Sequence, residues 1–249
     1  MPTLQEKQWL LTEKYAGVET PAYFADLARL EAGEPLAYLI GHVPFLATTI
    51  TLDSHPLIPR PETEYWTEIA TNDMRRADRS LFVLDLCAGS GAIGVAALAA
   101  LPRAHVDFAE IDTRHHATIE TNIRTNSIDP SRASLFGGDL FSEIPGDKRY
   151  DFILSNPPYI NPALSERVAE SVSAHEPHQA LFGGNAGMEI IARILRDAPA
   201  HLTERGVLYL EHEPEQCAQI HEIAERYAYA SCDTQTDQYG VNRFTRFSV

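Results

Sequence analysis

The pattern of hydrophobic and polar positions changes character near residue 80. Before that point, apolar side chains recur at helix-like spacing over residues 4–32, which predicts one or two helices. Residues 42–58 include positions that alternate between apolar and polar, as in a short β-hairpin. A helix is expected over about 62–78, because Pro61 suits the first turn of a helix. We therefore expect a small, mainly helical N-terminal part followed by a different kind of domain.

From residue 80 onward, short apolar runs alternate with segments of helical periodicity. Expected strands cover 81–86, 106–111, 134–136, 152–155, 206–211, 229–235 and 242–248. Expected helices cover 92–101, 113–126, 187–202 and 214–228. Repeated strand–helix units predict an α/β fold with a mostly parallel sheet that is covered by helices on both faces. Ligands of such sheets bind beyond the carboxyl ends of the strands, so the residues that follow each strand are the candidates for function.

The first of these strands leads into a loop that contains glycines, with the residues Asp85, Leu86, Cys87, Ala88, Gly89, Ser90 and Gly91. Glycines let the backbone approach a ligand closely, and the next helix begins with free amide groups. The loop is not a P-loop, because no Gly-Lys-Ser/Thr follows, and it lacks the register of GxGxxG. Taken alone it is a weak signal, with a tight strand-to-helix turn as the alternative.

Acidic residues follow the next two strands as well. Glu110 comes about 20 residues after the glycine loop, where an acidic side chain can accept hydrogen bonds from a ribose diol. Asp112 is expected to cap the next helix. Asp139 can accept the exocyclic amine of an adenine, with Leu140 packed on the ring. Capping and turn roles are the alternatives, but acids at three successive strand ends favour a nucleoside-containing ligand.

The fourth strand ends in Asn156-Pro157-Pro158-Tyr159. Two prolines cannot continue a central strand, and they fix the backbone φ. The Asn156 side-chain oxygen and the Pro157 carbonyl can each accept one N–H of a flat NH₂ group, while Tyr159 can stack on its plane or face a sulfonium. A polyproline turn with a capping asparagine is the alternative. The motif holds no strong base, so the expected chemistry aligns a poorly nucleophilic amide nitrogen with a methyl carbon and excludes water.

Composition narrows the possible partners. The 20 basic and 35 acidic residues give a net charge of −15, which counts against stable binding of nucleic acid. We expect no membrane span, because the chain has no long apolar run, and no secretory signal, because its first residues are polar. Three cysteines without CxxC spacing fit a reducing cytoplasm. The histidine-containing clusters near residues 115, 175 and 212 have no recognised ligand spacing, so no metal site is expected.

Several segments together resemble the HemK-type glutamine methyltransferases, which modify a glutamine side-chain amide in peptide-chain release factors. The matching segments are Gly33–Gly41 (GEPLAYLIG), Ile58–Glu64 (IPRPETE), the loop over 85–93, the NPPY motif at 156–159, Glu176–Gly187, Leu210–His212, and Asp237 with Gly240 and Arg243. The NPPY motif alone would also fit DNA adenine methyltransferases. The first two segments are far more specific to the HemK-type family.

The resemblance implies a class I S-adenosylmethionine-dependent methyltransferase with a Rossmann-like, seven-strand, mostly parallel sheet and a late antiparallel hairpin. It implies a reduced N-terminal helical segment over 1–32, a connecting hairpin and helix over 33–78, and a methyltransferase domain over 79–249. S-adenosyl-L-methionine would contact Asp85, Cys87, Ala88, Gly89, Ser90, Gly91, Glu110, Asp139, Leu140 and Asn156. The glutamine amide would be held by Asn156, Pro157, Pro158 and Tyr159, with Arg60, Glu62 and Thr63 near the mouth of the site.

The chain departs from the family in three places. Family members usually carry a longer N-terminal helical bundle that helps to grip the release factor, and Cys87 and Glu110 stand where glycine and aspartate are usual. Two other functions stay open at this point. One is methylation of another amide or amine, on a ribosomal protein, a small molecule or a nucleobase. The other is a non-catalytic cofactor-binding module that supports a partner protein.

Overall fold

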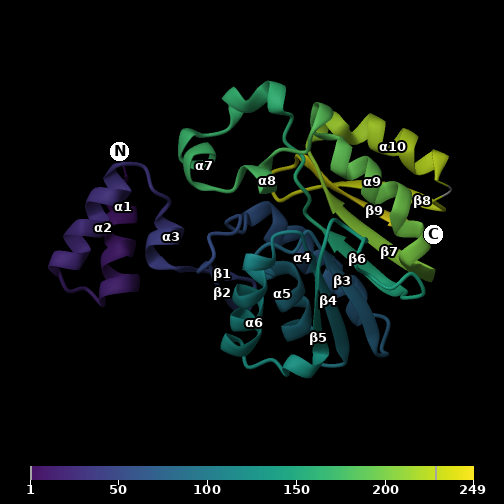
Figure 1. The fold of residues 1–249 in the computed structure, drawn as a ribbon, viewed down its shortest axis with the longest axis horizontal. Helices are drawn as coiled ribbons and strands as arrows, with labels where there is room; N and C mark the ends of the chain where they lie inside the picture. The colour runs from purple at the N-terminus through teal and green to yellow at the C-terminus, as the bar shows by residue number, and fades with distance from the viewer. Residues whose placement is uncertain (1, 228) are drawn as a thin grey trace.

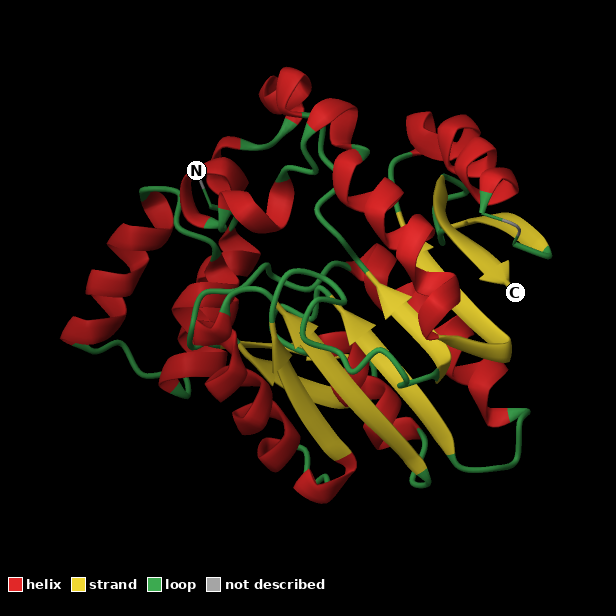
Figure 2. Cartoon of the chain, turned by 45° about the vertical axis from the view of Figure 1, so that its right-hand side comes forward, coloured by secondary structure: helices red, strands yellow, loops and turns green. Residues whose placement is uncertain are grey.

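The computed structural model describes residues 2–227 and 229–249, and its centre is a seven-stranded sheet with helices on both faces (Figures 1 and 2). The strands lie in the order β5-β4-β3-β6-β7-β9-β8. Their bounds are β3 (Leu81–Leu86), β4 (Ala104–Glu110), β5 (Ala133–Gly137), β6 (Tyr150–Ser155), β7 (Leu202–Glu211), β8 (Ser231–Thr236) and β9 (Asn242–Ser248). The neighbours from β5 to β7 are parallel, whereas β9 runs antiparallel to both β7 and β8. This confirms the predicted α/β fold with a late antiparallel hairpin.

The helices that cover the sheet alternate with the strands along the chain, as expected of strand–helix units. On one face lie α4 (Pro61–Arg75), α5 (Ala92–Ala100) and α6 (His116–Thr125), and on the other α9 (Glu189–Asp197) and α10 (Cys217–Arg226) (Figure 1). Short 3₁₀ helices adjoin three of them, at Thr113–His115, Ala198–His201 and Pro214–Gln216. The helices thus begin or end a few residues away from the predicted bounds. Residue 228, the last of the predicted 214–228 helix, lies outside the described residues.

Alternation along the strands divides the core between the two faces. Val83 of β3 is buried on the side of α4, α5 and α6, and the next residue, Leu84, is buried on the side of α9 and α10. Successive side chains of a strand point to opposite faces, so a strand that is covered on both sides must be apolar throughout. On the first side, Trp66 of α4 is fully buried, with its ring 6.5 Å from that of Tyr209 and 6.3 Å from that of Phe244. This packing fixes the start of α4 against β7 and β9.

The N-terminal helices form a separate cluster beside the sheet (Figure 1). They are α1 (Leu4–Trp9), a π-helical turn (Leu10–Lys14), α2 (Pro21–Glu31) and α3 (Leu36–Ile40). Their small core consists of Leu10, Tyr23, Leu30 and Leu39. The predicted helical range 4–32 covers α1, the π-helical turn and α2. The next helix, α3, lies beyond that range and was not predicted, because a helix of five residues is too short to show a period.

The segments between these parts complete the fold. The predicted hairpin at 42–58 contains β1 (His42–Phe45) paired with β2 (Thr48–Thr51). The stretch between β6 and α9 includes α7 (Glu170–His175) and α8 (His178–Leu181), which the sequence pattern did not predict. Among the described residues, the structure contains no helix with the length and apolar character that a membrane crossing requires.

Candidate active site

A cavity of about 380 Å³ opens at the carboxyl ends of the parallel strands. Its lining includes six residues that were assigned to the cofactor from the sequence, namely Cys87, Gly89, Glu110, Asp139, Leu140 and Asn156. They follow four different strands, β3, β4, β5 and β6, which are neighbours in the sheet. The parallel arrangement therefore brings together side chains that are far apart in the sequence.

The loop after β3 gives the cavity a wall of backbone. It turns through three residues with positive φ, which are Cys87 at 64°, Gly89 at 53° and Gly91 at 76°. A side chain in this left-handed region costs about 1–2 kcal/mol, which explains why glycines occur here and why Cys87 is an unusual occupant. A Cβ added at Gly89 would meet no protein atom within 4 Å. At Gly89 the backbone therefore borders open space, as close approach to a ligand requires.

Four residues that the sequence assigned to the cofactor, Asp85, Ala88, Ser90 and Gly91, are buried and absent from the cavity lining. Asp85 is fully buried beneath the loop, where its Oδ2 accepts the N–H of Gly94 at 2.8 Å. Burial raises the pKa of the Asp85 carboxyl to about 8, so it holds a proton at neutral pH. In this geometry Asp85 supports the turn from below instead of contacting a ligand.

Glu110 is the acid best placed toward the cavity. Its side chain is buried, with Oε2 accepting the N–H of Gly89 and Oε1 the N–H of Asp112, both at 2.8 Å. These two bonds fix the carboxylate and tie the β3 loop to the end of β4. Each carboxylate oxygen retains further acceptor capacity, which can serve a pair of hydroxyl groups. As predicted, Asp112 caps the next turn by accepting the N–H of Arg114.

Asp139 and Leu140 form the next part of the wall, after β5. Asp139 is exposed, and its Oδ2 is paired with the guanidinium of Arg193 from α9 at 2.7 Å. Leu140 is buried with a φ of 54°, a strained conformation for a leucine. The two residues therefore present an anchored acceptor beside an apolar surface, the pair that the sequence analysis proposed for an adenine.

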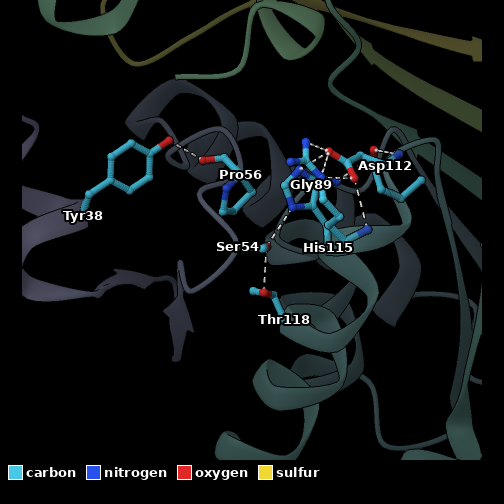
Figure 3. A network of polar contacts seen from close by, with 9 residues as sticks. Tyr38, Ser54, Pro56, Gly89, Asp112, His115 and Thr118 are labelled. Carbon is cyan, nitrogen blue, oxygen red and sulfur yellow. Dashed lines mark hydrogen bonds and ion pairs between the residues drawn. The ribbon is translucent and has the colours of Figure 1, made fainter. Parts of the chain in front are cut away.

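A polar network borders the cavity near residue 115 (Figure 3). The His115 Nδ1 lies 2.8 Å from the Ser54 Oγ, which in turn lies 2.7 Å from the Thr118 Oγ1. Burial lowers the pKa of His115, so the ring is held in its neutral form. Two residues after Ser54, the Pro56 carbonyl accepts the Tyr38 hydroxyl at 2.7 Å. The chain between β2 and α4 is thereby fixed beside the cavity.

The NPPY loop continues the wall after β6, and its asparagine is fixed in one orientation. Asn156 donates from Nδ2 to the Thr63 Oγ1 at 3.0 Å. Neither the Asn156 Oδ1 nor the Pro157 carbonyl accepts a hydrogen bond from any residue that the structure describes. Asn156 and Pro158 line the cavity. The loop thus carries two unused acceptors beside the space formed by the cofactor residues.

Tyr159 does not line the cavity, and its hydroxyl is engaged by Glu211 at the end of β7. Glu211 is 1 % exposed and accepts three hydrogen bonds, from Thr63 at 2.7 Å, Trp66 at 2.6 Å and Tyr159 at 2.9 Å. Burial raises the pKa of Glu211, while the three donors act in the opposite direction. Glu211 stands in a histidine-containing cluster and in a segment that matches the family, but its central position was not predicted from the sequence.

A glycine-containing loop supports the NPPY segment from behind. A Cβ at Gly187 would lie 2.0 Å from the Tyr159 carbonyl oxygen, and one at Gly183 would lie 2.4 Å from that of Pro158. Gln216 donates from Nε2 to the carbonyls of Tyr159 and Gly187, at 2.9 and 3.1 Å. Backbone packs on backbone here, so the position of the loop is defined closely.

The three residues predicted near the mouth have different surroundings. Arg60 pairs with the buried Glu176 at 2.6 Å, and Glu176 also accepts the N–H of Ile58 at 3.0 Å. Thr63 is buried beneath Asn156. Glu62 makes no side-chain hydrogen bond or ion pair with the described residues. Of the three, Arg60 forms an ion pair with the segment that precedes α8, and Thr63 forms a hydrogen bond with the NPPY loop.

Comparison with known proteins points to a methyltransferase fold. The family profile described as "Methyltransferase small domain" matches residues 67–181. A methyltransferase structure from Pyrococcus furiosus has a TM-score of 0.56 at 18% identity, over 90% of this chain and 98% of that one. The 16S rRNA N2 G1207 methyltransferase of T. thermophilus, solved in complex with AdoMet and guanosine, has a TM-score of 0.55 at 16% identity, over 83% of this chain and 49% of that one. At these identities the likeness concerns the fold.

The seven-stranded sheet and the cavity at its strand ends define a class I S-adenosylmethionine-dependent methyltransferase. A release factor glutamine methyltransferase of Bordetella pertussis is 33% identical over 247 residues, which cover 97% of this chain and 88% of the relative. A second, from Rhodopirellula baltica, is 35% identical over 81% of this chain and 69% of the relative. The chain belongs to the release factor glutamine methyltransferase family.

Proposed function

We propose that this chain methylates the side-chain amide nitrogen of a glutamine in a peptide-chain release factor, in the loop that carries Gly-Gly-Gln. Family membership supports the substrate class. The observation that carries the proposal is the pair of unused acceptors, the Asn156 Oδ1 and the Pro157 carbonyl, on a rigid loop beside the cavity. A primary amide has two N–H bonds, and two fixed acceptors suit it.

The residues that line the cavity suit the chemistry of S-adenosylmethionine. We assign Glu110 to the ribose hydroxyls, Asp139 and Leu140 to the adenine, and the backbone at Gly89 to close contact with the cofactor. When bound, the cofactor would supply a methyl group on a positively charged sulfur. The substrate nitrogen would take up this methyl group, the sulfur would remain as a neutral thioether, and the nitrogen would then release one proton to solvent. The apolar rings and prolines near the NPPY loop would keep water from competing for the methyl group.

The residues of the NPPY loop then act on the amide. An amide nitrogen is a weak nucleophile, because its lone pair is delocalised into the carbonyl. The Asn156 Oδ1 and the Pro157 carbonyl would each hold one N–H and so orient the nitrogen toward the methyl group. As positive charge develops on the nitrogen, both acceptors bind its hydrogens more strongly than in the ground state. No general base is required for the transfer, since the proton becomes acidic only as the new bond forms.

The direct test is methylation of release factors by the purified protein. We expect labelled S-adenosylmethionine to transfer its methyl group to the release-factor glutamine, as read by peptide mass spectrometry. Asn156→Ala should lower kcat at least 100-fold, because it removes an acceptor at the reacting nitrogen. Asn72→Ala, an exposed asparagine of α4, is the matched control and should retain activity. Wild-type protein that leaves this glutamine unmodified would exclude the proposal.

The N-terminal segment offers a surface for the protein substrate. Leu4, Trp9, Val18 and Phe24 are exposed there, at 86%, 47%, 58% and 53%. Exposed apolar side chains are candidates for contact with a partner protein. We propose that residues 1–32 contact the release factor and that residues 79–249 carry the chemistry. Trp9→Ala with Phe24→Ala should then raise the KM for the release factor several-fold at unchanged kcat.

The partners are proposed to be limited to this protein substrate. A net charge of −15 disfavours stable nucleic-acid binding, because phosphate groups would be repelled. We infer that the reaction takes place in the cytoplasm, because the proposed substrate belongs to the translation apparatus. The three cysteines, which are free in the structure, are consistent with a reducing compartment. Labelling of RNA or of a ribosomal protein in a cell lysate, with release factors left untouched, would favour the alternative substrates instead.

A further inference from the structure

The side chain of Asn156 is connected to a chain of hydrogen bonds that ends at a buried carboxylate. Nδ2 of Asn156 lies 3.0 Å from the Thr63 Oγ1, and the same Oγ1 lies 2.7 Å from the Glu211 Oε2. Thr63 is 3% exposed and Glu211 is 1% exposed. Neither Thr63 nor Glu211 lines the cavity, so neither is placed to touch a ligand directly.

Chemistry fixes the direction of each bond in this chain. The Thr63 hydroxyl donates its single hydrogen to the Glu211 Oε2, which acts here as an acceptor. The Thr63 oxygen then has only lone pairs to offer to Asn156. The amide group of Asn156 must turn its NH₂ toward Thr63, and its oxygen is left to face the substrate side. The reversed amide would bring two acceptors together and leave an N–H where the substrate requires an acceptor.

The indole of Trp66 makes the direction more secure. Its N–H donates to the same Glu211 Oε2 at 2.6 Å, and an indole N–H cannot accept. Oε2 is therefore held as an acceptor, while the Tyr159 hydroxyl occupies the other oxygen at 2.9 Å. The three donors come from α4 and the NPPY loop, so they also account for the burial of a carboxylate at this place.

We propose that Glu211 and Thr63 are positioning residues that hold the Asn156 amide with its Oδ1 toward the substrate nitrogen. The inference rests on the proposed function of Asn156 as an acceptor for the substrate amide. A primary amide turned by 180° has nearly the same shape, so packing alone selects one orientation poorly. The direction of the hydrogen bonds from Asn156 to Thr63 and from Thr63 to Glu211 selects one orientation of the amide and so places its Oδ1 toward the substrate.

The test replaces the hydroxyl of Thr63 and then restores it. Thr63→Val keeps the shape but removes both hydrogen bonds, and we expect kcat to fall about tenfold, the factor that corresponds to one hydrogen bond. Thr63→Ser keeps the hydroxyl and should stay within about twofold of wild type. Thr71→Val is the matched control, a buried threonine of α4 whose hydroxyl donates only to the Glu68 carbonyl. The affinity for S-adenosylmethionine should be the same, within about twofold, in all three variants.

A further variant separates bond direction from charge. In Glu211→Gln, the indole of Trp66 should hold the amide oxygen of the new side chain on the Thr63 side, while the new NH₂ group faces Tyr159. The order at Asn156 is then unchanged, and kcat should stay within about threefold of wild type. A loss as large as that of Thr63→Val would overturn the inference, because kcat would then depend on the charge of Glu211 and not on the direction of the hydrogen bonds.

A spectroscopic measurement reads the orientation without any substrate. In wild type and Thr63→Ser, the side-chain NH₂ protons of Asn156 should exchange slowly with solvent in ¹⁵N-resolved spectra, because one of them is hydrogen-bonded to Thr63. In Thr63→Val they should exchange at least several-fold faster. Equal exchange in Thr63→Val and wild type would overturn the inference, even if methylation of release factors succeeds. Protection together with an unmodified release factor would support the inference and reject only the proposed substrate.

Discussion

Gly187→Ala tests how tightly the NPPY loop is held from behind. The new Cβ would lie 2.0 Å from the Tyr159 carbonyl oxygen and 2.7 Å from the Gln216 Nε2. Real Cβ atoms essentially never approach another heavy atom within 3.0 Å, so the loop must move by about 1 Å. The carbonyl is part of the backbone and cannot rotate away as the end of a side chain could.

Two costs follow from this change, and they act on different measurements. Gly187 has a φ of 73°, so the alanine costs about 1–2 kcal/mol in stability through its left-handed backbone. The displaced loop also shifts the acceptors at Asn156 and Pro157 away from the reacting nitrogen. A misplacement of about 1 Å at a reacting group can lower the rate roughly 100-fold. We therefore expect kcat to fall by about two orders of magnitude, with little change in the affinity for S-adenosylmethionine.

Gly240→Ala is the matched control for this prediction. Gly240 has a φ of 77°, close to that of Gly187, but a Cβ there would meet no atom within 4 Å. Urea unfolding should show similar losses of stability from backbone strain, with a further loss in Gly187→Ala from the displaced loop. Methylation kinetics should show the drop in kcat in Gly187→Ala alone. The reasoning is refuted if Gly187→Ala keeps kcat within threefold of Gly240→Ala.

Three further predictions concern the cofactor wall, the core and pH. Glu110→Gln leaves one of two backbone N–H groups without its acceptor, so calorimetry should show binding of S-adenosylmethionine weakened about tenfold; unchanged affinity would contradict the assignment. Gly94→Ala places a Cβ 2.3 Å from the Phe108 ring, and urea unfolding should report a loss of about 1–3 kcal/mol. Burial lowers the pKa of His212 to about 4, so its stabilising contribution is complete above about pH 6.5 and is lost toward pH 4, at about 1.4 kcal/mol per pH unit. His212→Asn should flatten that part of the stability profile, and an unaltered slope would contradict it.

The sheet was predictable because its strands are covered on both faces. β3 and β6 are mainly apolar, with one aspartate each, and they lead into a glycine loop and a proline-containing loop, and such signals are local. The order of the strands was not readable from any single segment. The stretch between β6 and α9 was also not predicted, because α7 and α8 have six and four residues and lack a period. The place of α8 beside the cavity depends on distant contacts such as the pair of Arg60 with Glu176, which precedes α8.

The candidate site was predictable where one residue alone carries the signal. Glu110 ends a strand and Asn156 directly follows one, and the structure places both on the cavity wall. Asp85 has the same kind of position in the sequence, yet the turn after β3 leaves it beneath the loop. Whether an acid after a strand faces the ligand or the core depends on the φ of the next few residues. The sequence does not state those angles.

The acceptor on Asn156 and the residues that orient it come from different parts of the chain. The methyltransferase profile covers residues 67–181, which include the NPPY loop but neither Thr63, Trp66 nor Glu211. An NPPY loop alone fits several kinds of planar NH₂ group. The orientation of its asparagine depends on the start of α4 and on the end of β7. Thr63 stands 93 residues before Asn156, and Glu211 stands 148 residues after Thr63. In this chain the Ile58–Glu64 segment therefore has a physical reason to accompany the loop, since in the orientation proposed for Asn156 it supplies the hydroxyl that sets which atom of Asn156 meets the substrate.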